Sequence, residues 1–191
     1  GDKITDTTRI DKILPTLNFL ISQNAKIIII SHVGRPKGKV VNELSLRPIC
    51  KDLEVKLSHN IKLISKDVNK INSEELFNDN NEKIVMLENI RFYPEEEKNN
   101  LQFAKHLARL ADIFVNDAFS CSHRAHASVS NITKFIPSYS GLQLELEINA
   151  LKKIRRLLKL RYRKYPSNPH KWKSKPCPSK EKSQVFDGRN S

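Results

Sequence analysis

The chain has 191 residues, 38% of them hydrophobic, and its 34 Lys and Arg residues against 21 Asp and Glu residues give a formal net charge of +13. This length suits one ordinary domain with an appendage and excludes a large two-domain enzyme within the chain. The three cysteines are widely spaced and odd in number, which excludes a disulfide framework, and no apolar run is long enough to span a membrane, so we expect a cytoplasmic protein with no membrane partner.

The net charge is concentrated at one end of the chain. Residues 1–150 hold 20 basic and 19 acidic residues, whereas residues 151–191 hold 14 basic and 2 acidic ones. A strongly positive protein ordinarily binds an anionic partner such as nucleic acid or a membrane surface. Because the first 150 residues are nearly neutral, that inference applies to the tail alone.

The first predicted elements are a helix and a buried strand. The helix begins with Asp6 or Thr7 as its N-cap, and Pro15 within it requires either a kink or a helix start near this residue. The apolar face of the helix consists of Ile10, Ile13, Leu14, Leu17, Leu20 and Ile21. The run from Ala25 to Ser31 is short, apolar and rich in β-branched residues, which predicts a strand of a parallel sheet covered on both faces.

Helices and strands continue to alternate after this strand. Ser45 is the predicted N-cap of a second helix, and strands are predicted from Ile61, around Val85 and from Asp112. The inward faces of the second helix and of the helix near residue 105 are predicted to be Leu46, Ile49, Leu53 and Leu57, and Leu101, Ala104, Leu107, Ala108 and Ala111, respectively. This alternation predicts an α/β fold.

Basic side chains follow three of the predicted strands. They are His32 and Arg35 after the first strand, Arg91 after the strand at Val85, and His123, Arg124 and His126 after the last strand, with Arg9 near the start of the chain. In parallel sheets, ligands bind beyond the carboxyl ends of the strands. Guanidinium groups bind phosphate and carboxylate bidentately and keep their charge. The set therefore predicts a site for a phosphate or carboxylate ligand.

Each of these residues also has an ordinary structural interpretation. A single arginine or histidine after a strand is more often a solvated or ion-paired surface residue, and the co-occurrence of three basic loops is what favours a site. Residues 95–97 (EEE) are interpreted as a solvated helix start that the helix dipole favours. Cys121, His123 and His126 lack a fourth ligand and paired spacing, so we expect no metal site.

Three segments of the sequence are similar to the signature segments of one enzyme family. They are SHVGRPKG, LENIRFYPEEEKN and FVNDAFSCSHRAHAS, and ITDTTRI with the helix after it resembles the segment that precedes them. Over residues 2–150 the chain resembles the N-terminal, 3-phosphoglycerate-binding domain of phosphoglycerate kinase. The resemblance implies a three-layer, Rossmann-like parallel sheet. It also implies phosphate transfer between ATP and the carboxylate of 3-phosphoglycerate, or from 1,3-bisphosphoglycerate to ADP in reverse.

The resemblance also assigns roles to individual positions. It implies that 3-phosphoglycerate or 1,3-bisphosphoglycerate is bound by Arg9, His32, Val33, Gly34, Arg35, Arg91 and Arg124, with support from His123, His126, Asn116 and Asp117. It further implies that Arg9 is catalytic and stabilises charge during phosphoryl transfer. The nucleophile would be the substrate carboxylate, which is already ionised, so arginines without a general base fit this chemistry.

The chain departs from the family pattern in three places. The family's opening strand, with its substrate-contacting Asp and Asn, is missing, so we expect an incomplete sheet with unpaired edges. Residues 120–122 read Ser-Cys-Ser where the family has a Gly-Thr-Ala-like run. The five glycines form no phosphate-binding loop, so we expect no site here for the ATP or ADP and Mg²⁺ of the complete enzyme. A separate C-terminal, nucleotide-binding half is the implied partner.

The resemblance fades from Lys152 onward. We therefore predict a substrate-binding domain over residues 1–151, without its first strand, and a basic irregular tail over residues 152–191 that is disordered or non-native. One interpretation makes the tail a nucleic-acid-binding arm with Tyr162, Tyr165 and Trp172 as stacking residues. The loss of resemblance within one helix favours a frameshifted or decayed continuation instead, so we expect no nucleic-acid partner.

Three functions stay open at this point. The first is a fragment of phosphoglycerate kinase that holds the acceptor-substrate half and is inactive alone. The second is a non-catalytic anion-binding module or pseudoenzyme. The third is a protein that binds nucleic acid through its basic tail.

Overall fold

The computed structural model describes residues 7–77 and 82–163. Contacts between Cα atoms divide the chain into two units, Gly1–Leu151 and Lys152–Ser191. Asp6, Tyr165 and Trp172, which the sequence interpretation used, lie outside the described residues, and the nature of the tail stays a prediction.

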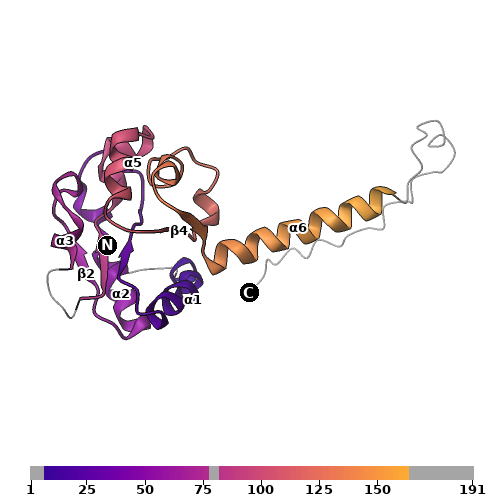
Figure 1. The fold of residues 1–191 in the computed structure, drawn as a ribbon, viewed down its shortest axis with the longest axis horizontal. Helices are drawn as coiled ribbons and strands as arrows, with labels where there is room; N and C mark the ends of the chain where they lie inside the picture. The colour runs from indigo at the N-terminus through magenta and orange to yellow at the C-terminus, as the bar shows by residue number, and fades with distance from the viewer. Residues whose placement is uncertain (1–6, 78–81, 164–191) are drawn as a thin grey trace, which may run out of the picture. The chain divides into compact units, whose positions relative to one another are not determined.

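Helices and short strands alternate along the described chain (Figure 1). The strands are β1 (Ile27–Ile29), β2 (Lys62–Ile64), β3 (Ile84–Leu87), β4 (Phe114–Asn116) and β5 (Ser138–Ser140). The α-helices are α1 (Thr8–Ser22), α2 (Arg47–Leu57), α3 (Ser73–Leu76), α4 (Pro94–Glu97), α5 (Leu101–Ala108) and α6 (Leu142–Arg163). Short 3₁₀ turns cover Asn42–Leu44, Val68–Lys70, Ile90–Phe92, Phe119–Cys121 and Asn131–Lys134.

All strand pairs of the described residues are parallel, which confirms the predicted sheet type. β3 lies between β1 and β2, with Ile28 opposite Val85 and Leu63 opposite Met86. β4 and β5 pair with each other in a second, two-stranded sheet. Within the described chain, β1 and β4 each leave one edge that no strand pairs, so the sheet is in two pieces rather than one.

Helices cover both faces of the three-stranded sheet, as the predicted three-layer architecture requires. Every residue of β3 is buried, and its side chains alternate between two apolar clusters. One cluster contains Ile84 and Met86 together with residues of α1 and α2, and the other contains Val85 and Leu87 together with residues of α5. Uninterrupted apolar sequence in β1 and β3 is the local signature of this two-sided burial.

The start of α1 and Pro15 show how the first helix forms. Thr7 is the N-cap residue, but its hydroxyl donates to Asp11 Oδ2 at 3.0 Å instead of accepting a backbone N–H. Pro15 lies inside α1 and does not end it, because the apolar face that includes Ile10 and Leu17 is packed on the core.

Two predicted helix boundaries are wrong by one to three residues. The N-cap of α2 is Leu46 rather than Ser45, whose hydroxyl donates to Glu88 Oε2 at 2.8 Å and so points toward the end of β3. Leu101 is 46% exposed and Ala111 is exposed, so neither faces the core. The Asn100 side chain caps the start of α5, and the helix ends at Ala108, which leaves both residues at its margins.

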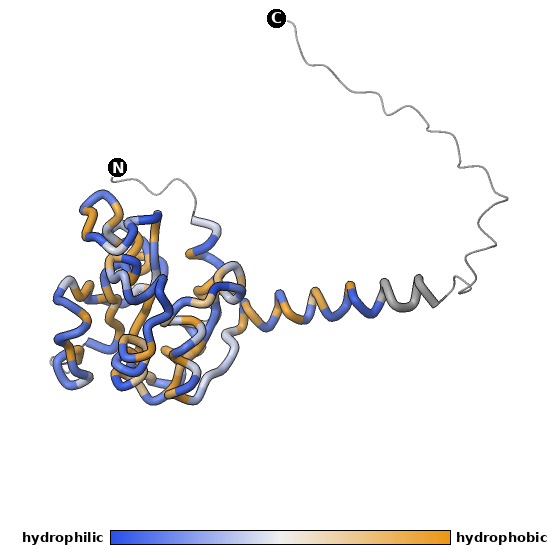
Figure 2. Tube along the Cα trace, turned by 90° about the horizontal axis from the view of Figure 1, so that it is seen from above, coloured by the Kyte–Doolittle hydropathy of each residue, from blue (hydrophilic) through white to orange (hydrophobic). Residues whose placement is uncertain are grey.

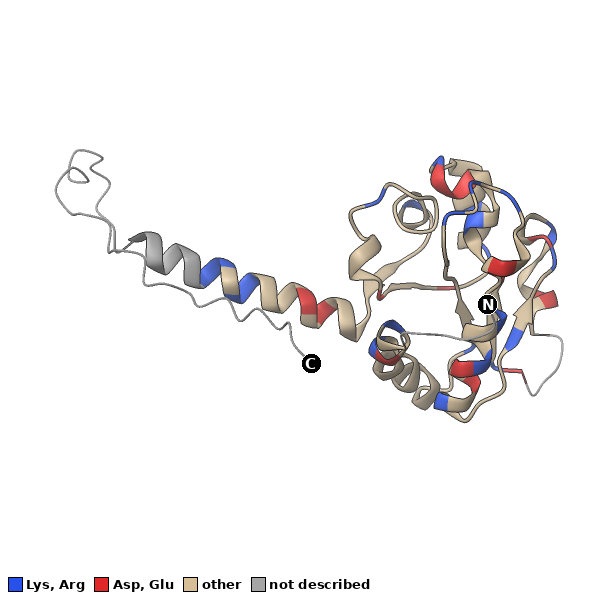
Figure 3. Ribbon diagram, turned by 180° about the vertical axis from the view of Figure 1, so that it is seen from behind, with Lys and Arg blue, Asp and Glu red and all other residues tan. Residues whose placement is uncertain are grey.

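The last helix, α6, is apolar on exposed positions. Figure 2 shows hydrophobic and hydrophilic residues alternating along it, and Figure 3 shows acidic residues near its start followed by basic ones. This charge order complements the helix dipole. Leu146, Leu151 and Ile154 are each at least 52% exposed.

A polar contact ties the start of α6 to β4 and α1. Asp117 Oδ2 accepts a hydrogen bond from Thr16 Oγ1 at 2.6 Å, and its Oδ1 accepts the Leu144 N–H at 2.9 Å. Thr16 Oγ1 in turn accepts the Leu142 N–H at 3.0 Å. A Cβ at Gly141 would lie 2.4 Å from the Asp117 carboxylate, so this approach requires glycine. The carboxylate therefore serves as a tertiary N-cap for α6.

We expect Asp117→Ala to lower the free energy of unfolding by about 2 kcal/mol, because it removes hydrogen bonds to a charged acceptor and uncovers helix N–H groups. Urea unfolding followed by circular dichroism measures the change. The matched control is Asp112→Ala, which removes an exposed carboxylate near the same strand. Equal losses in the two variants would contradict the capping role.

Candidate functional site

The basic residues predicted from the sequence lie on loops that follow β1, β3 and β4. His32 is close enough to Arg91, Arg124, His126 and Arg9 to feel the charge of each. The structure thus brings one residue from α1 and residues from three post-strand loops to one place. The rest of the predicted set is found at the margins of this group.

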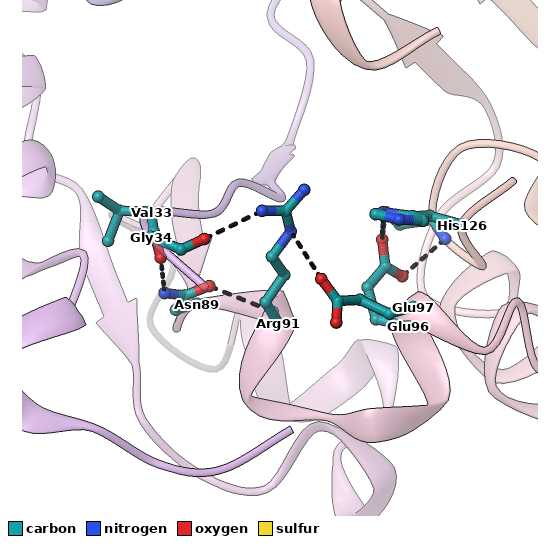
Figure 4. Close-up of polar contacts among 8 residues, drawn as sticks. Val33, Gly34, Asn89, Arg91, Glu96, Glu97 and His126 are labelled. Carbon is teal, nitrogen blue, oxygen red and sulfur yellow. Dashed lines mark hydrogen bonds and ion pairs between the residues drawn. The ribbon is translucent and has the colours of Figure 1, made fainter. Parts of the chain in front are cut away.

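Arg91 is the buried centre of the cluster. It lies in the turn Ile90–Phe92 directly after β3, and its side chain is only 4% exposed. Its Nη1 donates to the Gly34 carbonyl at 3.0 Å, and its Nε lies 3.7 Å from Glu97 Oε1 (Figure 4). Among the described residues, Nε and Nη2 have no hydrogen-bond partner. Buried donors without partners are costly, so this guanidinium is built to receive an acceptor.

Asn89 holds the Arg91 turn against the loop that follows β1, and sequence reasoning missed it. Its side chain is fully buried, and its Nδ2 donates to the carbonyls of Val33 at 2.8 Å and Leu44 at 2.9 Å. Its Oδ1 accepts the Arg91 N–H at 3.2 Å. An asparagine at the end of a fully apolar strand was the available signal, since a buried amide must be hydrogen-bonded.

The loop after β1 contributes backbone rather than side chains at two predicted positions. Val33 and Gly34 face the site through their carbonyl oxygens. Gly34 has φ +68°, and a Cβ there would lie 2.6 Å from the Leu44 side chain. Glycine is therefore needed for the turn that aims its carbonyl at Arg91. Arg35, the next residue, is exposed.

The loop after β4 brings Arg124 and His126 to the same region. Arg124 is half-buried, and its Nε has no hydrogen-bond partner among the described residues. His126 is half-buried with Nδ1 3.7 Å from Glu96 Oε1, whereas His123 is exposed. Arg124 therefore offers a second unsatisfied guanidinium donor.

Burial and positive neighbours keep the two inner histidines neutral. Burial, followed by the charges of Arg91 and Arg124, lowers the pKa of His32 from 6.5 to about 4. Burial and then the Arg91 charge also lower the pKa of His126. The positive charge of the site near neutral pH therefore comes from its arginines, and the imidazoles act as neutral hydrogen-bonding groups.

The two predicted supporting residues at the end of β4 point elsewhere. Asn116 Oδ1 accepts the Ala118 N–H at 3.0 Å, which shapes the start of the loop. Asp117 turns toward Thr16 and α6. Their contacts are with the scaffold rather than with the arginines.

The expectation that residues 95–97 form a solvated helix start is wrong for Glu96. Its side chain is 2% exposed, and it accepts hydrogen bonds from Ser128 N at 2.9 Å and Ser128 Oγ at 2.6 Å. Glu97, by contrast, is 41% exposed. The partner of Glu96 lies 32 positions away, so local sequence gives no sign of its burial.

Two searches of the described chain gave no hit. No group of three or more His, Cys, Asp or Glu side chains in this part of the chain has the arrangement of a metal site. No helix in the same residues is long and apolar enough to cross a membrane.

The geometry defines an α/β domain with a preformed arginine site for an anion. The family model of phosphoglycerate kinase matches residues 1–160 of the chain. Phosphoglycerate kinases from Wolbachia sp. subsp. Brugia malayi (strain TRS) and from Wolbachia pipientis subsp. Culex pipiens (strain wPip) are 49% identical over 155 and 149 residues. The chain therefore belongs to the phosphoglycerate kinase family.

Solved structures of the same family share the fold. The chain is 36% identical to the structure of phosphoglycerate kinase from Coxiella burnetii, with a TM-score of 0.71, and 28% identical to that from Pyrococcus horikoshii OT3, with a TM-score of 0.69. Each match covers 80% of this chain but 38% and 39% of those chains. The curated relatives are likewise matched over 79% and 78% of this chain and 38% and 37% of their own length.

We expect His32 to make the stability of the protein depend on pH between about 4 and 6.5. Its folded-state pKa, about 4, lies below the unfolded value of 6.5, so the unfolded chain binds the proton first. The stabilisation is therefore complete above pH 6.5 and is lost as the pH falls toward 4, with a slope of at most about 1.4 kcal/mol per pH unit.

Urea unfolding of the original protein and of His32→Gln from pH 7 to pH 4 measures this contribution. The substitution should flatten the pH dependence in that window. The control is His123→Gln at an exposed position. The prediction fails if His32→Gln leaves the slope unchanged.

Proposed function

We propose that this chain binds 3-phosphoglycerate, or 1,3-bisphosphoglycerate in reverse, as the acceptor-substrate part of a phosphoglycerate kinase. The buried Arg91 guanidinium carries the proposal, because two of its nitrogens lack a hydrogen-bond partner among the described residues while Arg124 and His32 lie near it. An anionic ligand would satisfy those donors and relieve the repulsion between like charges.

Arginine and neutral histidine suit the two ends of this ligand. Guanidinium groups bind phosphate and carboxylate in a planar, bidentate manner. A neutral imidazole such as His32 adds a hydrogen bond without further repulsion between cations. Arg35, His123 and the backbone of Val33 and Gly34 complete the proposed set around the ligand.

Arg9 is the proposed catalytic residue of the set. It is exposed on α1, and its charge reaches His32, so it lies at the open side of the cluster. In the complete enzyme the carboxylate of the substrate attacks the transferring phosphoryl group and needs no general base. A mobile positive charge at this position would stabilise the negative charge that spreads over the phosphoryl oxygens.

The described residues do not fit a nucleotide with Mg²⁺. The two glycines of positive φ, Gly34 and Gly38, pack against Leu44 and Pro94, so their loop leaves no open cradle for phosphates. The described acidic side chains likewise form no cluster for a cation. We assign ATP or ADP and Mg²⁺ to a nucleotide-binding half supplied by another part of the enzyme.

The division of the chain follows from the same proposal. Residues 1–151 form the cytoplasmic substrate-binding domain, and residues 152–191 form a basic tail outside the family pattern. The family model ends its match at residue 160, within α6, which supports a change of sequence character near this boundary.

We expect 3-phosphoglycerate to raise the melting temperature of the protein, and Arg124→Ala to weaken its binding by about tenfold or more, because a hydrogen bond to a charged group is lost. Isothermal titration calorimetry measures the dissociation constants. Arg109→Ala, at an exposed position on the scaffold, is the matched control. Binding that is equally strong in the two variants would refute the proposed site.

We expect no ATP-dependent turnover of 3-phosphoglycerate by this chain alone, because the described residues offer no nucleotide site. A coupled assay that follows ADP formation tests this, with a complete phosphoglycerate kinase as the positive control. Turnover above the background of Arg124→Ala would show that the chain holds a nucleotide site.

A further inference from the structure

We propose that Glu96 is a positioning residue that holds the Arg124 and His126 loop against the turn that carries Arg91. The inference rests on the proposed function, because it concerns how that anion site is preformed. Glu96 itself does not contact the ligand in this proposal.

Three hydrogen bonds join Glu96 to the loop. Ser128 N donates to Glu96 Oε2 at 2.9 Å, and Ser128 Oγ donates to Oε1 at 2.6 Å. The backbone N–H of Ala127 donates to the Glu96 carbonyl at 3.0 Å. Glu96, Ala127 and Ser128 are all buried, so these bonds are shielded from water.

The short helix α4 contacts both arms of the site. It begins two residues after Arg91 in the turn, and two adjacent glutamates point in different directions from it (Figure 4). Glu97 faces Arg91 Nε at 3.7 Å, and Glu96 reaches the loop and lies 3.7 Å from His126 Nδ1. One helical turn therefore sets the spacing between Arg91 and the loop of Arg124.

The loop has few other links to the rest of the domain. Its remaining backbone hydrogen bonds are local, such as those from Arg124 N to Cys121 O and from Ser130 N to His126 O. The Asn131 side chain donates to the Asn99 carbonyl at 2.6 Å beyond the end of the loop. The contacts of Glu96 are the ones nearest to Arg124 and His126.

A carboxylate is a costly choice for this buried position. Burial raises the pKa of Glu96, while the two Ser128 hydrogen bonds and the Arg91 charge lower it in part. An apolar side chain would avoid the desolvation of a carboxylate but would leave the Ser128 donors unsatisfied. The acidic side chain is explained by what it holds in place.

The test compares Glu96→Gln and Ser128→Ala with Ile64→Val. Glutamine keeps the shape of the side chain but accepts well from one of the two Ser128 donors, and Ser128→Ala removes the hydroxyl bond alone. Ile64→Val is a conservative core substitution in β2 that lowers stability without touching the site. Calorimetric titration with 3-phosphoglycerate and amide hydrogen exchange of the unliganded protein are measured for each.

We expect Glu96→Gln to weaken binding by about tenfold and Ser128→Ala by a smaller factor, with the double variant weaker by less than the product. The amides of Ala127 and Ser128 should exchange faster in Glu96→Gln and not in Ile64→Val. If the original protein binds and Glu96→Gln binds equally well, or its loop exchanges no faster, the positioning role is wrong. If the original protein does not bind 3-phosphoglycerate, the proposed function itself is wrong.

Discussion

The site depends on hydrogen bonds made by two side chains at the carboxyl end of β3. Glu88 accepts the Leu46 N–H and the Ser45 hydroxyl, which fixes the start of α2. Asn89 binds the carbonyls of Val33 and Leu44 and the backbone of Arg91. Because β3 is buried on both faces, these side chains are held by a rigid strand. The loops of two neighbouring elements are therefore arranged from one point.

The charge of the site has a physical consequence for its ligand. Gathering Arg91, Arg124 and Arg9 near two histidines is unfavourable without an anion, and the lowered pKa values of His32 and His126 express this repulsion together with burial. Part of the cost is met inside the protein, where Glu97 and the Gly34 carbonyl face Arg91. The remaining unsatisfied donors are what a phosphate or carboxylate would meet.

The scaffold outside the central sheet is held by fewer and more specific contacts. β4 and β5 form a separate sheet whose residues are half-buried or exposed. Asp117, Thr16 and Gly141 join this part to α1 and to the start of α6. The loop of Arg124 is attached through Glu96 in a similar way. Single polar side chains thus replace extensive apolar packing where the arginine-bearing loops are anchored.

Sequence alone determined the parts of this protein that depend on neighbouring residues: the apolar strands β1 and β3, the core faces of α1 and α2, and the basic loops after the strands. Patterns with periods of two or 3.6 residues encode such features locally. Only the tertiary structure decided that the sheet is in two pieces, that Asn89 and Glu96 are buried organisers, and that Asp117 caps α6. Thr16 and Asp117 are 101 positions apart, and Glu96 and Ser128 are 32 apart. Contacts between such distant positions leave no periodic pattern, so they exist only once the chain is folded.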